Sequence, residues 1–553
     1  MVLKMTENIM KKAFLVMIIC IAAFAQVPEL LWTHDLLSHC YGSPACADID
    51  FDGKLEIVFG TYFDDEHAYA LNAEDGSLLW RFDVGGGPLD AAPVIADVDM
   101  DDSLEVIIPA SWGIVYCLSG DGEVEWRYPA SGYCECIDSP PAVADVDEDG
   151  RPEVIFGAWY GKVYVLDGED GSLAWSVGLC DTGYVQSAPC ILDCDDDGHL
   201  DIVVAMFRGD CTVYALSGQS SAVKWSYRAD DWMYAGAATA DIDLDGKPEL
   251  VIGDYSGKVF ALNAEDGSFI WEESIGYYVF PPVTIAELND AYDGLEILAA
   301  DYELTCLTAE GEFLWEFPTG GNIDRGAVVA EIDGDRELEV IIGSSDCYLY
   351  VLNGEDGSLV WEYLVDSTYQ IENAPIVEDF DDDGWVDIFC IGGWGTSDTI
   401  PNYGRAYAIK AGHGSGEVWT MYRHDPFRTG YLNGGPTSVF ETASPRPSLI
   451  SLSVSPNPFN SAVKISLDFG SELSELLSTI EIFDLNGRRV AQLSGGGTVG
   501  AWHRHAPHAE EDLSMPNPYE FTWQPAPSLG SGVYLVRARA GDKEAMKRIV
   551  YLK

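Results

Sequence analysis

Apolar residues between positions 26 and 433 come in short runs separated by polar turns, and the order of these runs repeats. One unit contains four such runs: SPPAVADV (139–146), PEVIFGAW (152–159), GKVYVLDG (161–168) and GSLAWSVG (171–178). Runs rich in Val, Ile and aromatic residues, bounded by Asp, Gly and Pro, are typical of strands, and no apolar spacing of 3.6 residues is present. Each unit therefore predicts four antiparallel strands and no helix.

Two marks locate the repeats along the chain. A carboxylate-rich turn begins at Asp48, Asp97, Asp145, Asp193, Asp241, Glu287, Glu331 and Asp379, at steps of 44 to 49 residues. A tryptophan ends each unit, at Trp80, Trp126, Trp175, Trp225, Trp271, Trp315, Trp361 and Trp419. Four strands per repeat of this length indicate a β-propeller blade, so we expect an all-β fold with an eight-bladed propeller, or a seven-bladed one if a degenerate unit is not a full blade. Trp32, in ELLWTHDL, indicates that an N-terminal strand helps to close the last blade.

The turns of each unit predict which loops share a face. Asp-Gly pairs beginning at 75, 121, 170, 266 and 356 predict two-residue hairpin turns of type I′ between the third and fourth strands. Because strand direction alternates, these turns lie on the same face as the carboxylate turns between the first and second strands. A ring of equivalent sites favours structural ions over catalytic ones.

The carboxylate turn has the ligand chemistry of a calcium site. In DVDEDGRPEV (145–154), Asp145, Asp147 and Asp149 alternate, Gly150 permits a bend, and Glu153 supplies a closing carboxylate. Oxygen ligands in this number suit Ca²⁺, although an EF-hand loop would place its closing acid at position 12 instead of 9. Without an ion, neighbouring carboxylates would repel one another by roughly 1 kcal/mol per pair. We therefore predict several structural calcium ions.

The predicted calcium ligands recur in seven of the eight repeats. They are Asp48, Asp50, Asp52 and Glu56; Asp97, Asp99, Asp101 and Glu105; Asp145, Asp147, Asp149 and Glu153; Asp193, Asp195, Asp197 and Asp201; Asp241, Asp243, Asp245 and Glu249; Glu331, Asp333, Asp335 and Glu339; and Asp379, Asp381, Asp383 and Asp387. Asp102 and Arg336 replace the expected glycine in two of them. The loop that starts at Glu287 has an extra residue, and we expect it to be empty.

Both marks resemble known families. The loop with its following EVIFG, ELVIG or EVIIG strand resembles FG-GAP/VCBS repeats of the integrin α-subunit type. LNAEDGSLLW (71–80) and its copies resemble the tryptophan-docking motif of PQQ-type quinoprotein propellers. The FG-GAP resemblance implies side-chain ligands at positions 1, 3, 5 and 9 and a backbone carbonyl at position 7. Together the resemblances cover residues 29 to about 430 and support the fold more than any one activity.

The loops of the opposite face are irregular and rich in aromatic residues. Rigid amphipathic rings on variable loops are typical of recognition surfaces. We therefore predict a face that binds a glycan or a protein. The candidate ligand-binding residues are Trp112, Trp159, Tyr160, Trp232, Tyr255, Tyr302 and Trp394.

No specific catalytic constellation is present in the sequence, and we expect no catalytic residues. G-x-S-x-G, P-loop and H-E-x-x-H motifs are absent. His503, His505 and His508 could bind a transition metal, but a solvated Gly/Pro-rich loop is favoured. An extracellular enzyme acting on polysaccharide, a lyase or hydrolase, is the alternative function. A quinone-cofactor enzyme is a third, although the adjacent cysteines expected of quinoprotein dehydrogenases are lacking.

The two ends of the chain predict export. Residues 1–25 have the basic start, apolar run and Ala-x-Ala site of a signal peptide. Residues 434–448 form a Gly/Pro/Ser/Thr linker, and 449–553 alternate apolar and polar residues as a small Ig-like β-sandwich does. SPNPFN, DLNGR, SGVY and a basic final strand resemble type IX secretion C-terminal sorting domains of FlgD-like Ig fold. The resemblance implies interaction with type IX secretion machinery and a location outside a Gram-negative-type bacterium, secreted or surface-attached.

Charge is concentrated in the repeat region. Residues 26–435 carry 16 Lys and Arg against 79 Asp and Glu, whereas residues 436–553 carry 11 against 12. This field disfavours nucleic acid and anionic membranes as partners. We expect a monomer with no transmembrane segment after signal cleavage. Cys134 with Cys136, or Cys180, Cys190 and Cys194, are candidates for disulfides, but free thiols are equally compatible with a core this large.

Overall fold

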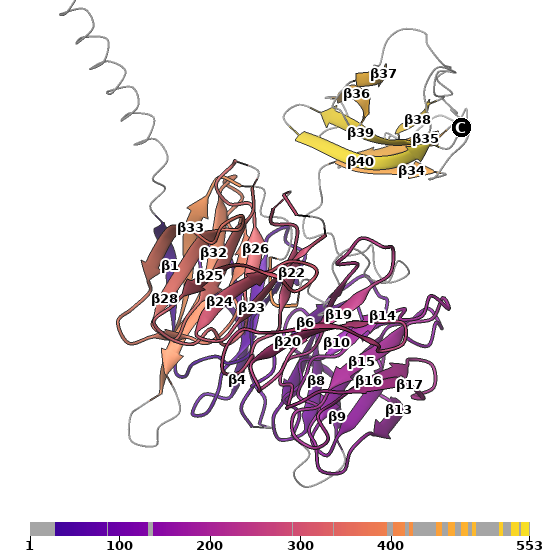
Figure 1. Cartoon of the computed structure of the whole chain (residues 1–553). Coiled ribbons are helices and arrows are strands. Elements are labelled where there is room, and N and C mark those ends of the chain that lie inside the picture. Colours follow the sequence, from indigo (N-terminus) through magenta and orange to yellow (C-terminus); the bar gives the residue numbers. More distant parts are fainter. Residues whose placement is uncertain are drawn as a thin grey trace, which may run out of the picture. The chain divides into compact units, whose positions relative to one another are not determined.

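The part of the chain that the structure describes contains forty β-strands and no helix (Figure 1). The structure is a computed structural model, and it divides the chain into two units, residues 1–442 and 443–553. In the first unit it describes residues 28–85, 87–130, 136–289, 291–292, 294–335, 337–394, 402–414 and 420–423, and in the second it describes seven strands. The predicted signal peptide (1–25), the linker (434–448), Cys134 and the three histidines at 503, 505 and 508 lie outside these residues. The all-β prediction is confirmed.

Eight antiparallel sheets make up the first unit, and each is one blade. Blades one to seven each contain four strands: β2 (Ala45–Ala47), β3 (Glu56–Gly60), β4 (His67–Asn72) and β5 (Leu78–Asp83); β6 (Val94–Ala96), β7 (Glu105–Ala110), β8 (Ile114–Leu118) and β9 (Val124–Pro129); β10 (Ala142–Ala144), β11 (Glu153–Ala158), β12 (Lys162–Asp167) and β13 (Leu173–Gly178); β14 (Cys190–Leu192), β15 (Asp201–Ala205), β16 (Thr212–Ser217) and β17 (Val223–Arg228); β18 (Ala238–Ala240), β19 (Glu249–Gly253), β20 (Lys258–Asn263) and β21 (Phe269–Ser274); β22 (Thr284–Ala286), β23 (Glu296–Ala300), β24 (Glu303–Leu307) and β25 (Phe313–Pro318); β26 (Val328–Ala330), β27 (Glu339–Gly343), β28 (Tyr348–Asn353) and β29 (Leu359–Leu364). The eighth contains β30 (Gln370–Ile371), β31 (Ile376–Glu378), β32 (Val386–Trp394), β33 (Tyr403–Gly412) and β1 (Glu29–Leu36).

The first and last strands of the propeller pair with each other. β1 runs antiparallel to β33, with Thr33 opposite Tyr407, and the indigo β1 lies beside the orange β33 in Figure 1. The eight-bladed prediction is therefore confirmed, including the closing role of the N-terminal strand. Trp32 takes the fourth-strand position in this blade, and Trp419, which the repeat pattern assigned to it, lies outside the described residues. The pairing holds the two ends of the propeller segment in one sheet, with β1 as its outer strand.

The repeated tryptophan docks each blade onto the next. Trp126 Nε1 in blade two donates a hydrogen bond to the carbonyl oxygen of Gly168 in blade three at 2.7 Å. The same bond recurs around the ring, from Trp32, Trp80, Trp175, Trp225, Trp271 and Trp315 to the following blade. A Cβ on Gly171 would lie 2.5 Å from the Trp126 ring, so only glycine fits under the indole. The docking geometry agrees with the PQQ-type resemblance of these residues.

The Asp-Gly turns differ from the prediction of two-residue type I′ hairpins. In blade one, the amide of Gly76 donates to Asn72 O and the amide of Asn72 donates to Ser77 O, both at 2.9 Å, so four residues form the turn. A positive φ occurs at Gly76 (68°) and not at Asp75. The reason is the strand register, which pairs Asn72 with Ser77 and leaves four residues between them; a β-bulge follows this turn, between Leu78 and Trp80.

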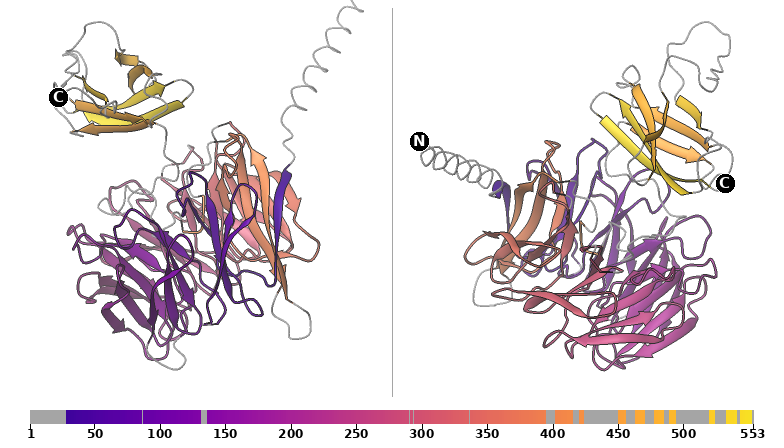
Figure 2. Two further views of the ribbon diagram at one scale, coloured as in Figure 1. Left: turned by 180° about the vertical axis from the view of Figure 1, so that it is seen from behind. Right: turned by 45° about the horizontal axis from the view of Figure 1, so that its top comes forward.

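The apolar core lies between neighbouring blades. One buried cluster contains Val94 and Ile107 of blade two together with Val154 and Phe156 of blade three. Inner strands such as β10 are buried along their whole length, whereas the outer β13 exposes alternate residues. Two views of the ribbon in Figure 2 show the sheets of this unit as separate twisted blades. Cys180 and Cys194 carry free thiols, so the disulfides proposed for this pair of positions are absent.

The second unit contains two antiparallel sheets. β35 (Val463–Phe469) pairs with β34 (Ile450–Ser455) and β38 (Tyr519–Trp523), and the other sheet has the order β37 (Arg489–Leu493), β36 (Leu477–Asp484), β39 (Gly532–Ala540), β40 (Lys543–Tyr551). The assignment of this unit as an Ig-like sorting domain stays a prediction.

Candidate metal loops and candidate ligand face

The loop between β10 and β11 gathers the four predicted carboxylates. One oxygen from each of Asp145, Asp147, Asp149 and Glu153 lies within 4.8 Å of the others. Backbone amides set this arrangement, since the amide of Asp149 donates to Asp147 Oδ1 and that of Gly150 to Asp145 Oδ2, each at 3.1 Å. Gly150 adopts a positive φ of 91°, which permits the bend. The local hydrogen bonds thus turn alternate side chains toward one point.

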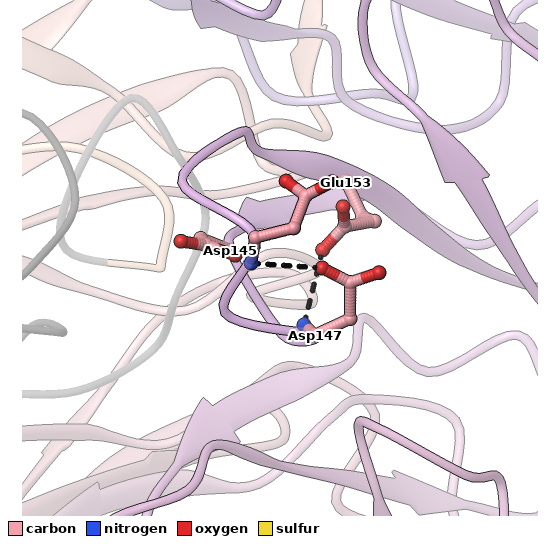
Figure 3. A group of neighbouring side chains, drawn as sticks. Asp145, Asp147 and Glu153 are labelled. Carbon is pink, nitrogen blue, oxygen red and sulfur yellow. Dashed lines mark hydrogen bonds between the residues drawn. The ribbon is translucent and has the colours of Figure 1, made fainter.

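The closing acid is anchored on the buried side of the loop. Glu153 Oε2 accepts hydrogen bonds from the amides of Val146 at 2.8 Å and Asp147 at 3.4 Å (Figure 3). The Oδ1 atom of Asp145 is buried and has no hydrogen-bond partner among the described residues. A buried carboxylate oxygen without a partner costs free energy unless a cation or another donor reaches it.

The same anchor recurs in the other loops. In every blade a buried closing acid accepts a hydrogen bond from a backbone amide near the loop start, and these acids are Glu56, Glu105, Glu153, Asp201, Glu249, Glu296, Glu339 and Asp387. Carboxylate clusters are also formed by Asp48, Asp50 and Glu56, by Asp97, Asp99 and Asp101, by Asp193, Asp195 and Asp197, and by Asp241, Asp243 and Glu249. The remaining predicted ligands, Asp52, Asp245, Glu331, Asp333, Asp335, Asp379, Asp381 and Asp383, lie in the same turns.

Two loops depart from this pattern. In the Glu287 loop, which we expected to be empty, Asn289 Oδ1 accepts a hydrogen bond from the amide of Ala291 at 3.0 Å, so this oxygen is engaged within the loop. Asp293 lies outside the described residues. In the Asp193 loop, the ammonium group of Lys224 lies among the carboxylates.

The closing acids are electrostatically unfavourable as anions in the absence of a cation. Burial, together with the charges of Asp147 and Asp145, raises the pKa of Glu153 to about 8. Burial likewise raises the pKa of Glu56, Glu105 and Glu339 to about 8. In blade four, burial raises the pKa of Asp201 only to about 6, because Lys224 opposes the shift. A cation in the loop would stabilise the ionised form in the same way.

The carboxylate turns and the Asp-Gly turns lie side by side, as predicted. The amide of Ala73 donates to Leu55 O at 2.9 Å. Lys54 Nζ lies 2.5 Å from Glu74 Oε1. The remaining loops, between second and third strands and between blades, contact one another at the other ends of the strands, where the amide of Tyr255 donates to Trp232 O at 2.8 Å.

Aromatic side chains of blades three to six form one connected set, which we call the aromatic network. Its members are Trp159, Tyr184, Phe207, Trp232, Tyr234, Tyr255, Tyr278, Phe280 and Tyr302. Trp159 stacks on Tyr184 with 4.4 Å between ring centroids, and Phe207 contacts Trp232 at 5.9 Å and Tyr255 at 5.4 Å. Trp232 and Tyr302 keep 36% and 46% of their surface exposed. The network therefore combines half-buried rings with exposed ones.

Arg208 places a cation over three rings of this network. The guanidinium carbon of Arg208 is 5.6 Å from the ring centroids of Tyr184 and Trp232 and 5.5 Å from that of Phe207. Arg208 has a positive φ of 63°, a backbone conformation that residues other than glycine rarely adopt. The position of its side chain therefore depends on this turn. Arginine above aromatic faces offers both stacking and hydrogen-bond donors to a ligand.

The structure brings together only part of the predicted ligand-binding set. Trp159, Trp232, Tyr255 and Tyr302 belong to the aromatic network. Three further predicted residues do not join it: Trp112, Tyr160 and Trp394. Trp112 is 61% exposed and packs over Gly87, Tyr160 is 45% exposed, and Trp394 has a buried indole nitrogen with no partner in the described part of the chain.

Sequence reasoning missed a buried charged cluster at the centre of the ring. Arg325 Nε donates to Tyr41 O at 2.8 Å, and its Nη2 lies 3.5 Å from Asp90 Oδ1. Its guanidinium also lies 5.5 Å from the ring centroid of Tyr234. Asp138 Oδ2 accepts hydrogen bonds from Trp159 Nε1 and Gln186 Nε2, both at 2.9 Å. These contacts join the cluster to the aromatic network.

The central cluster lines a small cavity and holds several acids. Asp90, Asp138, Gln186, Tyr234 and Arg325 are among its lining residues. Burial raises the pKa of Asp90 to about 6 and also raises that of Asp138. The sequence did contain one indication of this cluster. Asp90 and Asp138 occupy equivalent positions before the inner strands of their blades, in LDAAPV and IDSPPAV. The arginine gave no such signal, because no other repeat has an arginine there.

Comparisons with known proteins support the fold. A family described as "Outer membrane protein assembly factor BamB", built from PQQ-like repeats, matches residues 113–291, and one described as "Lambda-carrageenase beta-propeller domain" matches residues 296–378. No curated protein matches the chain. FG-GAP/VCBS repeats and a type IX sorting domain are not among these matches.

Several solved structures are similar. The biofilm matrix protein Bap1 of V. cholerae has a TM-score of 0.56 at 16% identity, covering 75% of this chain and 97% of that one. The quinohemoprotein alcohol dehydrogenase of Comamonas testosteroni has a TM-score of 0.52 at 14% identity, covering 71% and 78%. Sqt1 of Saccharomyces cerevisiae has a TM-score of 0.52 at 10% identity, covering 70% and 100%. Because proteins with such different descriptions share this fold, the similarity supports the fold and no particular function. The chain therefore carries PQQ-like repeats within an all-β, eight-bladed β-propeller.

Proposed function

We propose that this protein is a secreted or cell-surface β-propeller that calcium stabilises and that binds a glycan through its aromatic network. The observation that carries the binding function is the stacked, partly exposed set of rings beneath Arg208. Aromatic faces pack against the apolar faces of sugar rings, and the surrounding amides and carboxylates accept and donate hydrogen bonds. These rings and hydrogen-bonding groups suffice for binding a glycan, and no catalytic residue is needed.

The recurrent carboxylate loops support calcium. Hard oxygen ligands in this number suit Ca²⁺, and the buried oxygens Asp145 Oδ1, Glu339 Oε1 and Asp387 Oδ1 have no hydrogen-bond partner in the described residues. An ion at each loop would satisfy these atoms and tie the turn between the two inner strands. The ions are structural, because equivalent sites recur on the face away from the aromatic network.

The charge of the propeller favours a neutral ligand. Its 79 acidic residues between 26 and 435 repel polyanions at low salt. A neutral or amino-sugar glycan is therefore favoured over a sulfated one, and Arg208 serves as a stacking and hydrogen-bonding group. A protein ligand, the alternative to a glycan, would contact the same rings.

Export follows from the ends of the chain. A signal peptide at 1–25 and a C-terminal domain that resembles type IX sorting domains would carry the protein to the outside of a Gram-negative-type cell. The two sheets of the second unit are compatible with this role. Within the described residues, no helix has the length and apolar character needed to cross a bilayer. We expect a monomer.

A second candidate is an enzyme that acts on polysaccharide. The observation that favours it is the central cluster, where Asp90, Asp138 and Arg325 surround a cavity and burial raises the pKa of both acids. Raised pKa values suit a general acid. The carrageenase propeller match over residues 296–378 is compatible with this candidate.

Screening the full chain on a glycan array, with calcium and with chelator, tests the binding function. We expect a small set of related neutral glycans to bind, with binding reduced in chelator because the scaffold loosens. Absence of any glycan signal from folded, calcium-loaded protein would contradict the proposal. Incubating each bound glycan with the protein and measuring release of oligosaccharides separates binding from catalysis.

A further inference from the structure

One position in every blade lies in a β-bulge immediately before the docking tryptophan. In blade four, Ala215 pairs with Trp225 and Leu216 pairs with Val223, so Lys224 is the extra residue. The equivalent residues around the ring are Leu31, Leu79, Glu125, Ala174, Lys224, Ile270, Leu314 and Val360. Bulges redirect a side chain relative to the sheet. Six of these residues are apolar, one is acidic and one is basic.

In blade four the bulge residue places its charge inside the carboxylate loop. Lys224 Nζ lies 2.8 Å from Asp195 Oδ1, 2.8 Å from Asp201 Oδ2 and 3.4 Å from Asp197 Oδ2. The side chain of Lys224 is 20% exposed and that of Asp201 is 1% exposed. Three carboxylates that were predicted to bind an ion therefore already share a cation of the chain itself.

Lysines near other loops do not do this. Lys54 in blade one and Lys247 in blade five pair with Glu74 and Glu265 in the neighbouring Asp-Gly turns, not with the closing acid. Lys410 of β33 contacts both Asp381 and Asp383 in blade eight, but it makes no ion pair with the closing acid Asp387, whose buried Oδ1 stays without a hydrogen-bond partner in the described residues. Only in the Asp193 loop, within the described chain, does an ammonium bridge the closing acid and two loop aspartates.

We propose that Lys224 is a built-in cation that takes the place of the calcium ion in blade four, and that the bulge residue decides which cation each loop accepts. An ammonium and a calcium ion would compete for the same oxygens, since Ca²⁺ needs six to eight of them at 2.3–2.6 Å. The ammonium is covalently tethered, so its local concentration far exceeds that of a free ion. This inference rests on the proposed calcium function of the other loops.

The acidic bulge residue acts in the opposite direction. Glu125 in blade two lies close enough for its charge to act on Asp99 and Asp101. A further carboxylate strengthens the attraction of that loop for cations, and at a given distance it attracts a divalent ion about twice as strongly as a monovalent one. The blade with Asp102 in place of glycine thus gains a charge that the other blades lack.

Counting bound calcium by native mass spectrometry tests the proposal. Lys224→Met keeps the length of the side chain and removes its charge, and we expect it to bind one calcium ion more than the wild-type protein. Ile270→Met, at the same position in blade five, is the matched control and should leave the count unchanged. All variants are purified in calcium, so that loss of the ammonium does not leave the loop without a cation.

The reciprocal variant keeps the test informative if Lys224→Met does not fold. Ile270 is 40% exposed, so Ile270→Lys is tolerated sterically and should lower the count by one. If the wild-type protein binds calcium and neither variant changes the count, the assignment of Lys224 is wrong while the calcium function stands. If the wild-type protein and Lys224→Met both bind no calcium, the calcium function itself is wrong.

Discussion

Trp32 Nε1 donates a hydrogen bond to the carbonyl oxygen of Ala73 at 2.8 Å, across 41 residues of sequence. The bond joins blade eight to blade one, and the indole ring covers Gly76 of the same turn. Because β1 continues directly into blade one, its pairing with β33 closes the ring, and the Trp32 contact fixes this strand against blade one.

Replacing Trp32 with Phe should destabilise the propeller modestly. The ring can still pack over Gly76, but the hydrogen bond is lost and the Ala73 carbonyl loses a donor, which costs about 1 kcal/mol in the free energy of unfolding. Chemical denaturation of the full chain measures this. Trp112→Phe, at a tryptophan that is 61% exposed, is the control, and an equal effect of the two changes would contradict the closing role of Trp32.

Removal of calcium should lower the melting temperature strongly. An ion present at about 100 times its Kd contributes roughly 2.7 kcal/mol to the free energy of unfolding, and several loops act together. Calorimetry with and without chelator measures the effect. An unchanged melt in chelator would rule out structural calcium.

Asp145→Asn should remove one bound calcium ion and leave the others. The amide can still accept the hydrogen bond from Gly150, so the loop keeps its shape while losing a charge. Asp170→Asn, in the Asp-Gly turn of the same blade, is the control because its oxygen accepts from Ser172 outside the carboxylate loop. A loss of one ion in both variants would show that net charge, not ligation, is responsible.

Glu372→Gln should stabilise the protein increasingly as the pH rises above 4.5. Burial raises the pKa of Glu372 to about 8 from 4.5, so the folded state holds this proton more tightly than the unfolded state does. The resulting stabilisation is complete below pH 4.5 and is lost as the pH rises to about 8. The variant should therefore match the wild-type melting temperature near pH 4.5 and exceed it near pH 9.

The matched control for this pH dependence is Glu362→Gln, at an exposed glutamate of β29. Thermal melts across the pH range should show no pH-dependent difference for it. If Glu372→Gln shifts the melting temperature equally at both ends of the range, its effect is steric and not linked to the proton.

Trp232→Ala should weaken binding of an array-identified glycan by about 30-fold, which corresponds to ~2 kcal/mol for a central aromatic residue. Trp112→Ala, on a loop at the same ends of the strands but outside the aromatic network, should bind as the wild type does. Calorimetric titration with the glycan measures both. Equal losses would place the ligand elsewhere on the face.

Much of the propeller could be predicted because its evidence is local and repeated. Each carboxylate turn and each docking tryptophan can be recognised from about ten consecutive residues. Because the pattern occurs in eight copies, a chance match is negligible. The closing strand could be predicted as well, since Trp32 is a tryptophan without a preceding repeat. The prediction of type I′ turns was wrong because the pairing of Asn72 with Ser77 is set by strand register, which a short-range sequence pattern does not reveal.

The sequence by itself determined the repeat length, the position of each carboxylate loop and the two faces, because these follow from repeat spacing and strand alternation. The choice of eight blades over seven was decided by the sheet that β1 completes with β33. Only the tertiary structure decided that Lys224 points into its loop, since a bulge sets the direction of that side chain. Only ring closure brings Arg325 to Tyr41 and Asp90, residues more than 200 positions away. Contacts between distant repeats depend on the geometry of the whole ring, and no local pattern encodes them.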